Sequence, residues 1–132
     1  MNVRVVLDGS ALLTYARLDG LAVGELIAMV EEDGGEAVVG IPAASFLPAY
    51  AALSADERVR LVAMATAIDG VTAILPLQGC DAVEVAELDS RLGEPGLAPA
   101  IVEVSRHDSL LATYAPAAAR TVVPHDRVLD LN

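Results

Sequence analysis

Short apolar runs alternate along the chain with segments in which apolar residues recur at helical spacing. The runs have the length and composition of buried strands and lie at 3–7, 37–41, 71–75 and 110–113. The segments of helical period lie at 10–17, 21–32, 54–68, 80–92 and 98–107. Strands and helices that alternate in this way are typical of a parallel sheet with helices on both faces. We therefore expect an α/β fold of three layers, α/β/α, around a central, mostly parallel sheet of four to five strands.

Local residues mark several of the expected helix ends. Ser54 and Glu57 have the spacing of a capping box, in which each side chain satisfies a free backbone donor of the other, so a helix begins there. A shorter helix follows Pro42, and the Gly- and Pro-rich segment 93–96 predicts a loop. Two short segments, 121–123 and 128–129, are candidate edge strands. Neither a linker nor a repeat interrupts the pattern, so residues 1–132 are expected to form a single domain.

Composition narrows the class of protein. Apolar residues make up 55% of the chain and its mean hydropathy is +0.53. No uninterrupted apolar run approaches the roughly 20 residues of a membrane span, and the chain enters its first strand without a secretory signal. We expect a cytoplasmic protein with no membrane contact. The single cysteine, Cys80, cannot form an internal disulfide and is expected to be an inert packing residue.

Charge argues against unaided binding to nucleic acid. The formal net charge is −11, and the eight cationic residues are arginines scattered along the chain. Nucleic-acid binding depends on clustered cations, and single-strand binders also use aromatic platforms, of which this chain offers few. We therefore expect no binding to RNA unless a divalent metal ion or a basic partner supplies positive charge.

Asp8 is the first candidate for a functional residue. It directly follows the first apolar run and precedes a helical segment, and the carboxyl ends of parallel strands are where α/β sheets bind their ligands. The same position suits a second role, because a carboxylate just before a helix accepts hydrogen bonds from its free backbone N–H groups. Both interpretations of Asp8 stay open at this point.

Four segments of the chain, in this order, resemble the PIN domain and in particular the small VapC-type toxins of toxin–antitoxin pairs. They lie at 5–13, 39–43, 71–77 and 106–113 and together extend over most of the chain. Members of that family are metal-dependent ribonucleases. The resemblance implies that three or four carboxylates at the ends of strands and helices hold Mg²⁺ or Mn²⁺, which activates water and stabilises charge on the phosphodiester.

The chain departs from the family at the metal ligands. The first acid corresponds to Asp8, and the second falls on Pro48, which is tolerable in a first helical turn if Ser45 is the N-cap. The third falls on Leu97 or Pro99, depending on the register. A fourth would follow Thr113, where the chain has Tyr-Ala-Pro. The resemblance thus implies a degenerate site that retains Asp8 as its one metal ligand, if it binds metal at all.

Other residues near this expected site have two interpretations each. Ser10 matches a small hydroxyl residue of the family, and it is equally suited to be a helix N-cap. Thr113 matches the family and could bind a phosphate oxygen, or it could simply be a strand residue. Glu94 and Asp108 are loop acids that could substitute as ligands or be solvated surface groups.

Other chemistries find no support. The two histidines and one cysteine do not form a zinc ligand set at a recognised spacing, and His107 suits the last turn of a helix. The absence of lysine excludes a Walker-type phosphate loop.

The resemblance and the missing carboxylates together favour a PIN-like pseudo-nuclease, that is, a non-catalytic module without a cofactor. We expect it to bind a protein partner, antitoxin-like or regulatory, and to form a homo-oligomer. Surplus apolar residues and the acidic charge, which suits a basic partner, motivate this hypothesis. The alternative is an active Mg²⁺-dependent endoribonuclease toxin that uses Asp8.

Overall fold

A five-stranded parallel sheet forms the centre of the computed structural model, which describes all 132 residues. Its strands lie in the order β3-β2-β1-β4-β5. Their bounds are β1 Asn2–Leu7, β2 Ala37–Pro42, β3 Thr72–Leu75, β4 Leu110–Thr113 and β5 Val128–Asp130. All four strand pairs are parallel, so every strand has its carboxyl end at the same edge of the sheet. The predicted parallel sheet is confirmed.

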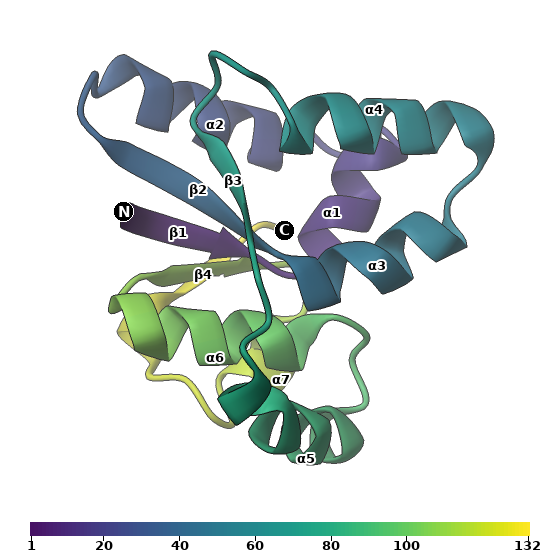
Figure 1. Cartoon of the computed structure of the whole chain (residues 1–132), viewed down its shortest axis with the longest axis vertical. Helices are drawn as coiled ribbons and strands as arrows, with labels where there is room; N and C mark the ends of the chain where they lie inside the picture. Colours follow the sequence, from purple (N-terminus) through teal and green to yellow (C-terminus); the bar gives the residue numbers. More distant parts are fainter.

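Helices cover both faces of this sheet (Figure 1). One layer contains α1 Gly9–Ala16, α2 Ala22–Glu32, α3 Ala43–Ala52 and α4 Ala55–Ala65. The other contains α5 Ala82–Leu92, α6 Leu97–His107 and the short α7 Pro116–Ala119. Two 3₁₀ turns, η1 Gly79–Asp81 and η2 His125–Arg127, complete the chain. The three-layer α/β/α architecture expected from the sequence is therefore present.

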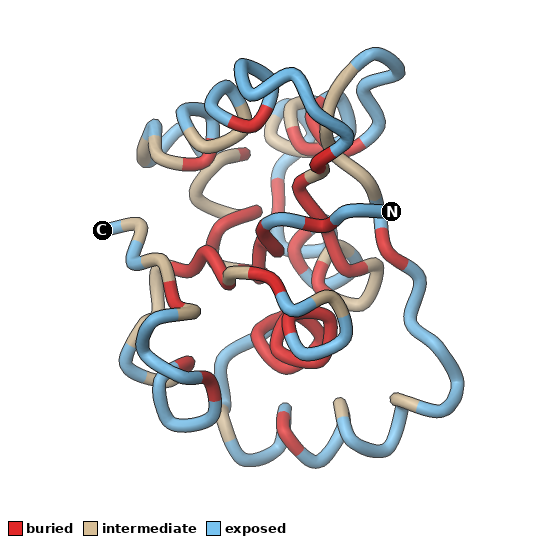
Figure 2. The backbone as a smooth tube through the Cα atoms, turned by 90° about the vertical axis from the view of Figure 1, so that its left-hand side faces the viewer, coloured by how far each residue is buried: buried red, intermediate tan, exposed pale blue.

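The first strand separates two hydrophobic cores. Val5 and Leu7 pack in the core beneath α1 to α4, whereas Val3 and Val6 pack in the core beneath α6. Strict alternation would put Val3 and Val5 on the same face, but the β1–β2 register shifts between these two residues. Helix α6 is buried over most of its surface and α5 is largely exposed outside it (Figure 2).

Two expected elements differ from the structure, and a third agrees with it. The helix opened by the Ser54–Glu57 capping box ends at Ala65, before the predicted end at 68, and Ile68 is almost fully exposed in the loop that follows. Segment 121–123 is a turn after α7 and not an edge strand, because it follows a short helix that sequence periodicity did not detect. Segment 128–129 is indeed a strand, and it pairs with β4.

None of the helices has both the length and the apolar composition needed to cross a membrane.

Candidate functional site

Asp8 and Thr113 lie side by side at the carboxyl edge of the sheet. Asp8 follows the last residue of β1 and Thr113 ends β4, and these two strands are neighbours, with Leu7 opposite Ala112. The Asp8 side chain is buried, with the residue only 1% exposed. The resemblance pointed to this edge, and the fold brings Asp8, Ser10 and Thr113 together there.

Every oxygen of the Asp8 carboxylate has a hydrogen-bond donor. Oδ1 accepts hydrogen bonds from Ser10 Oγ at 2.7 Å and from the Ala11 backbone N–H at 2.9 Å. Oδ2 accepts one from Thr113 Oγ1 at 2.6 Å. The two hydroxyls accept in turn from the backbone N–H groups of Tyr114 and Ala115, both at 2.9 Å. The result is a closed polar network that ties β1 and α1 to the end of β4.

Asp8 is the N-cap of α1. Its backbone is extended, with φ −88° and ψ −177°, and its side chain accepts from the N–H three residues on. The capping role that was left open for Asp8 is therefore present in the structure. The equivalent role suggested for Ser10 is wrong, because Ser10 lies inside the first turn of α1 and its hydroxyl instead links Asp8 to β4.

Burial raises the pKa of the Asp8 carboxyl above its usual value of 3.8, because the charged form loses its contact with water. The hydrogen bonds from Thr113, Ser10 and the Ala11 backbone favour the charged form and oppose part of this rise. The carboxylate is therefore held by neutral donors alone, with no cationic side chain bonded to it.

The loop before α6 closes against the residue that follows Asp8. The Gly96 carbonyl accepts from the Gly9 N–H at 3.2 Å and from the buried Ser45 hydroxyl at 2.7 Å. A Cβ added to Gly9 would lie 2.4 Å from the Pro95 carbonyl oxygen, so only glycine permits this approach. The starts of α1, α3 and α6 thus meet beside the carboxylate. The sequence analysis did not predict this contact. Gly9 and Gly96 were the available signal, because residues without a side chain permit such a close approach of two backbones.

A hollow of about 390 Å³ lies between α3, α5 and α6. Three prolines line it, Pro48 from α3, Pro95 from the loop and Pro99 from α6. The only acidic side chain on its walls is the exposed Asp89. Two of the positions at which the resemblance implies carboxylates, Pro48 and Pro99, thus face the same hollow without a side-chain oxygen. Leu97, the other register of the third acid, is fully buried.

The expectation that Pro48 lies in the first turn of its helix is wrong. The N-cap of α3 is Pro42, and Pro48 lies in the interior of the helix. Ser45 is therefore not the N-cap, and its hydroxyl is committed to the Gly96 carbonyl. An interior proline removes one backbone hydrogen bond and crowds the preceding turn, so this position lowers the stability of α3.

The two loop acids do not complete a ligand set. Glu94 is exposed in the loop between α5 and α6. Asp108 is the C-cap of α6 and pairs with Arg127 at 2.6 Å. Because Asp108 precedes β4 and Thr113 ends it, Asp108 lies at the opposite edge of the sheet, and the expectation that it lies near Asp8 is wrong. No three His, Cys, Asp or Glu side chains gather anywhere in the structure in a way that could hold a metal ion.

The remaining candidates lie apart from Asp8. His107 is in the last turn of α6, as expected, with Nε2 3.1 Å from Oε2 of the buried Glu103. Glu103 also accepts from Arg106 at 2.9 Å, a cluster whose helical spacing was visible in the sequence but was not singled out. Cys80 is exposed and not a packing residue, because it lies in the turn η1 that precedes α5.

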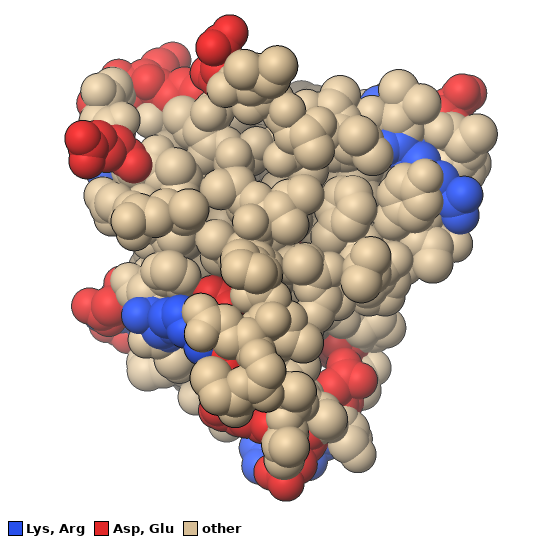
Figure 3. All heavy atoms as spheres, viewed as in Figure 1, with Lys and Arg blue, Asp and Glu red and all other residues tan.

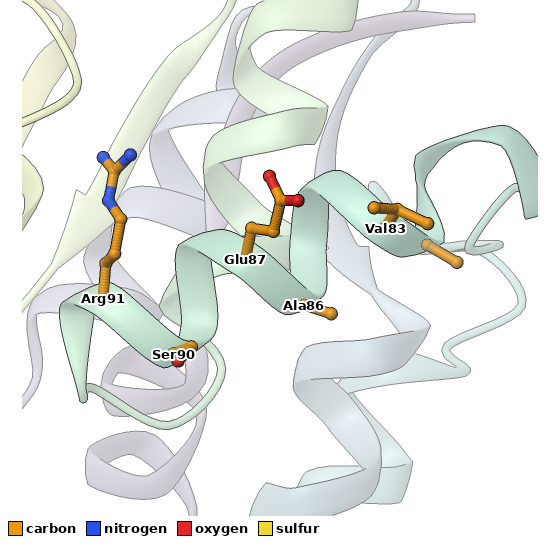
Figure 4. Close-up of a pocket in the computed structure, with 6 residues that line it drawn as sticks. Val83, Ala86, Glu87, Ser90 and Arg91 are labelled. Atoms are coloured by element: carbon orange, nitrogen blue, oxygen red, sulfur yellow. The ribbon is translucent and has the colours of Figure 1, made fainter.

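The outer face of α5 carries a further shallow hollow, lined by Ala82, Val83, Ala86, Glu87, Ser90 and Arg91 (Figure 4). All of these residues belong to one helix, and no second element brings polar groups toward them. This hollow offers no convergent chemistry.

Comparison with solved structures identifies the architecture. The chain matches the structure of FitAB bound to the IR36 DNA fragment, with a TM-score of 0.59 and 17% sequence identity over 96% of this chain and 94% of the matched chain. No protein-family model matches the sequence, and no curated protein matches it. The likeness covers nearly the whole of both chains, and the chain has a PIN-like fold.

Proposed function

We propose that this PIN-like domain has lost most of the metal-binding carboxylates of its fold and works in the cytoplasm as a non-catalytic protein-binding or regulatory module. The observation that carries this proposal is the chemistry of the hollow beside the carboxyl edge. Pro48 and Pro99 face it at positions where the resemblance implies acids. Neither proline side chain has an oxygen that could bind a cation.

The side-chain oxygens available at this site do not suit the divalent metal ion that the resemblance implies. Mg²⁺ requires near-octahedral coordination by oxygen, usually from one or two carboxylates, waters and substrate phosphates. Asp8 is the one carboxylate at the expected place, and each of its oxygens already accepts at least one short hydrogen bond. Three of the roughly four lone-pair sites of the carboxylate already accept hydrogen bonds from groups that cap α1 and connect β4, which leaves about one site, on Oδ2, for a cation. Asp8 is therefore better suited to a structural role than to ligating a metal.

A protein partner agrees with the composition and with the structural neighbour. Exposed large apolar side chains such as Leu47, Val59 and Val83 remain on the surface. The net charge of −11 favours a basic partner and disfavours unaided contact with RNA phosphates. The similar structure is FitAB bound to a DNA fragment, and the resemblance to VapC-type toxins implies an antitoxin-like partner; both support a protein partner for this domain.

Metal binding and RNA cleavage test the proposal together. Purified wild-type protein is titrated with Mn²⁺ by calorimetry and incubated with structured RNA in Mg²⁺ or Mn²⁺, alongside Asp8→Asn, which keeps the size and capping ability of the side chain. We expect no saturable Mn²⁺ binding at micromolar concentrations of the metal. We also expect no difference in RNA cleavage between the wild type and Asp8→Asn. Metal-dependent cleavage by the wild type that is lost in Asp8→Asn would overturn the proposal and establish the alternative, an active Mg²⁺-dependent endoribonuclease toxin.

A further inference from the structure

A hollow of about 280 Å³ lies at the amino edge of the sheet, opposite the edge that holds Asp8. It is enclosed by α6, by the residues just before β4 and by the segment between α7 and η2. The buried side chains of Ile101, Val104 and Val123 form its apolar walls. Ser109, which directly precedes β4, also lines it. The length of β4 therefore separates this amino-edge hollow from the network around Asp8.

Ser109 has a buried hydroxyl without a partner. The residue is 3% exposed, and its Oγ is the only buried side-chain oxygen or nitrogen in the structure that makes no hydrogen bond. Its side chain points to the α6 face of the sheet, where the hollow lies, because Leu111, two positions later, packs in the core beneath α6. A hydroxyl that has left water without gaining a partner costs free energy. A bound molecule with a hydrogen-bonding group would recover that free energy.

An ion pair holds the rim of the amino-edge hollow. Arg127 Nη2 lies 2.6 Å from Oδ1 of Asp108, and Arg127 Nη1 donates to the Asp108 backbone carbonyl at 2.9 Å. Asp108 has a left-handed backbone with φ +51°, which is uncommon outside glycine. The two contacts with Arg127 hold this turn against η2. The hollow is therefore formed before any ligand binds, as most small-molecule sites are.

The charges around the hollow disfavour an ionic ligand. Asp108 and Arg127 neutralise one another, so neither offers an unpaired charge. Acidic atoms lie at several separate places around the margin of the face drawn in Figure 3, and the net charge of −11 repels an anion. A cation would have to leave water for apolar walls without a free carboxylate to pair with. An uncharged molecule meets neither cost.

We propose that the amino-edge hollow binds a small uncharged molecule with an aliphatic or alicyclic body and one hydroxyl or carbonyl group. The body packs against Ile101, Val104 and Val123, and the oxygen bonds to Ser109 Oγ, which can both donate and accept. At about 30 Å³ for each water-sized group, the volume holds roughly nine such groups. Water alone suits the site poorly, because apolar walls offer few of the polar partners that retain a buried water. This inference goes beyond the proposed function, since none of these residues takes part in it.

Titration of the full chain with cyclohexanol, followed by ¹H–¹⁵N NMR, tests the proposal. We expect saturable shifts at the backbone amides of Val104, Ser109 and Val123, with a dissociation constant on the order of 1 mM or lower. Cyclohexanecarboxylate and cyclohexylamine have the same ring and carry opposite charges. Each should bind at least about tenfold more weakly than cyclohexanol, because the hollow has no unpaired charge to receive it.

Ser109→Ala tests the role of the hydroxyl. It should weaken cyclohexanol binding about fivefold, whereas Ser90→Ala, at an exposed serine of α5 that does not line the hollow, should leave the affinity unchanged. The melting temperature is a second measurement. Ser109→Ala should melt no lower than the wild type, because it removes a buried group that has no partner.

Three outcomes overturn the proposal. The first is a wild type in which cyclohexanol causes no saturable shift at these amides. The second is equal affinity for all three probes or for the wild type and Ser109→Ala, because binding is then unspecific contact with apolar surface. The third is a Ser109→Ala variant that melts below the wild type, because the hydroxyl then already has a partner in the free protein.

Discussion

Thr113 donates a hydrogen bond from Oγ1 to Oδ2 of Asp8 over 2.6 Å, although the two residues are 105 positions apart in the chain. The contact joins the ends of β4 and β1, and Ser10 on the other side of the carboxylate extends the connection into α1. Asp8, at this edge of a PIN-like sheet, is therefore the centre of a local hydrogen-bond network.

Replacing Thr113 by valine tests the strength of this connection. Valine has nearly the same shape but removes the donor to Asp8 and the acceptor of the Ala115 N–H. Because both partners are buried or half-buried, we expect the free energy of unfolding to fall by about 1–3 kcal/mol in urea denaturation. Thr121→Val is the control, since that hydroxyl bonds an exposed backbone carbonyl and its loss should change stability by less than about 0.5 kcal/mol. Equal effects of the two substitutions would contradict a special role for Thr113.

The raised pKa of Asp8 predicts a pH dependence of stability with a definite sign. Between the usual value of 3.8 and the higher value in the folded protein, the folded state binds more protons at Asp8 than the unfolded state does. The contribution of Asp8 to the free energy of unfolding is therefore largest below 3.8 and falls as pH rises through the folded-state pKa. Urea denaturation of the wild type and Asp8→Asn, from about pH 3 to about pH 8, isolates this contribution.

Comparing the wild type with Asp8→Asn removes the contribution of all other carboxyl groups to the pH dependence of stability. Glu57 and Asp130 have lowered pKa values, because hydrogen bonds from Ser54 and Asn132 favour their charged forms. They contribute stability at higher pH that is lost on acidification, and they do so equally in both proteins. If the wild type instead becomes more stable relative to Asp8→Asn as pH rises, hydrogen bonding lowers the pKa of Asp8 by more than burial raises it.

Gly9 and Gly24 form a matched pair for testing the contact between α1 and the loop before α6. Gly9→Ala places a Cβ 2.4 Å from the Pro95 carbonyl oxygen, so the loop must move and the protein should lose about 1–3 kcal/mol of stability. Gly24 lies in α2 with no atom within 4 Å of an added Cβ, and Gly24→Ala should gain about 0.5–1 kcal/mol from helix propensity. Thermal unfolding followed by circular dichroism measures both. A neutral Gly9→Ala would mean that the loop is not held against α1.

Adding acids to the proline-lined hollow tests whether it corresponds to the metal site that the resemblance implies. The double variant Pro48→Asp with Pro99→Asp adds two carboxylates to walls that now offer only Asp89. We expect its Mn²⁺ affinity in calorimetry to exceed that of the wild type by about tenfold or more, because hard cations require clustered oxygen ligands. The double alanine variant at the same positions is the control for the loss of the two rings. Equal affinity in the acidic and alanine variants would show that the hollow is not the equivalent site.

The alternation of apolar runs and helical segments determined the architecture of this protein. Burial of strands on both faces requires continuous apolar runs, which is why segments 3–7 and 37–41 were recognised as β1 and β2 almost to the residue. Ser54 and Glu57 marked the start of α4 because a capping box is a local interaction. Asp8 could be placed at a carboxyl edge for a similar reason, since its position depends only on the strand before it.

Only the tertiary structure decided how distant residues use that edge. In the folded chain, Asp8 accepts a hydrogen bond from Thr113, Asp108 lies at the opposite edge of the sheet, and Gly9 lies against Gly96. The tertiary structure also placed Pro48 inside α3, facing a hollow shared with Pro99. Local patterns record which residues favour a strand or a helix, because those preferences act over a few neighbours. Contacts across the sheet depend on strand order and register, which are set by packing of the whole chain.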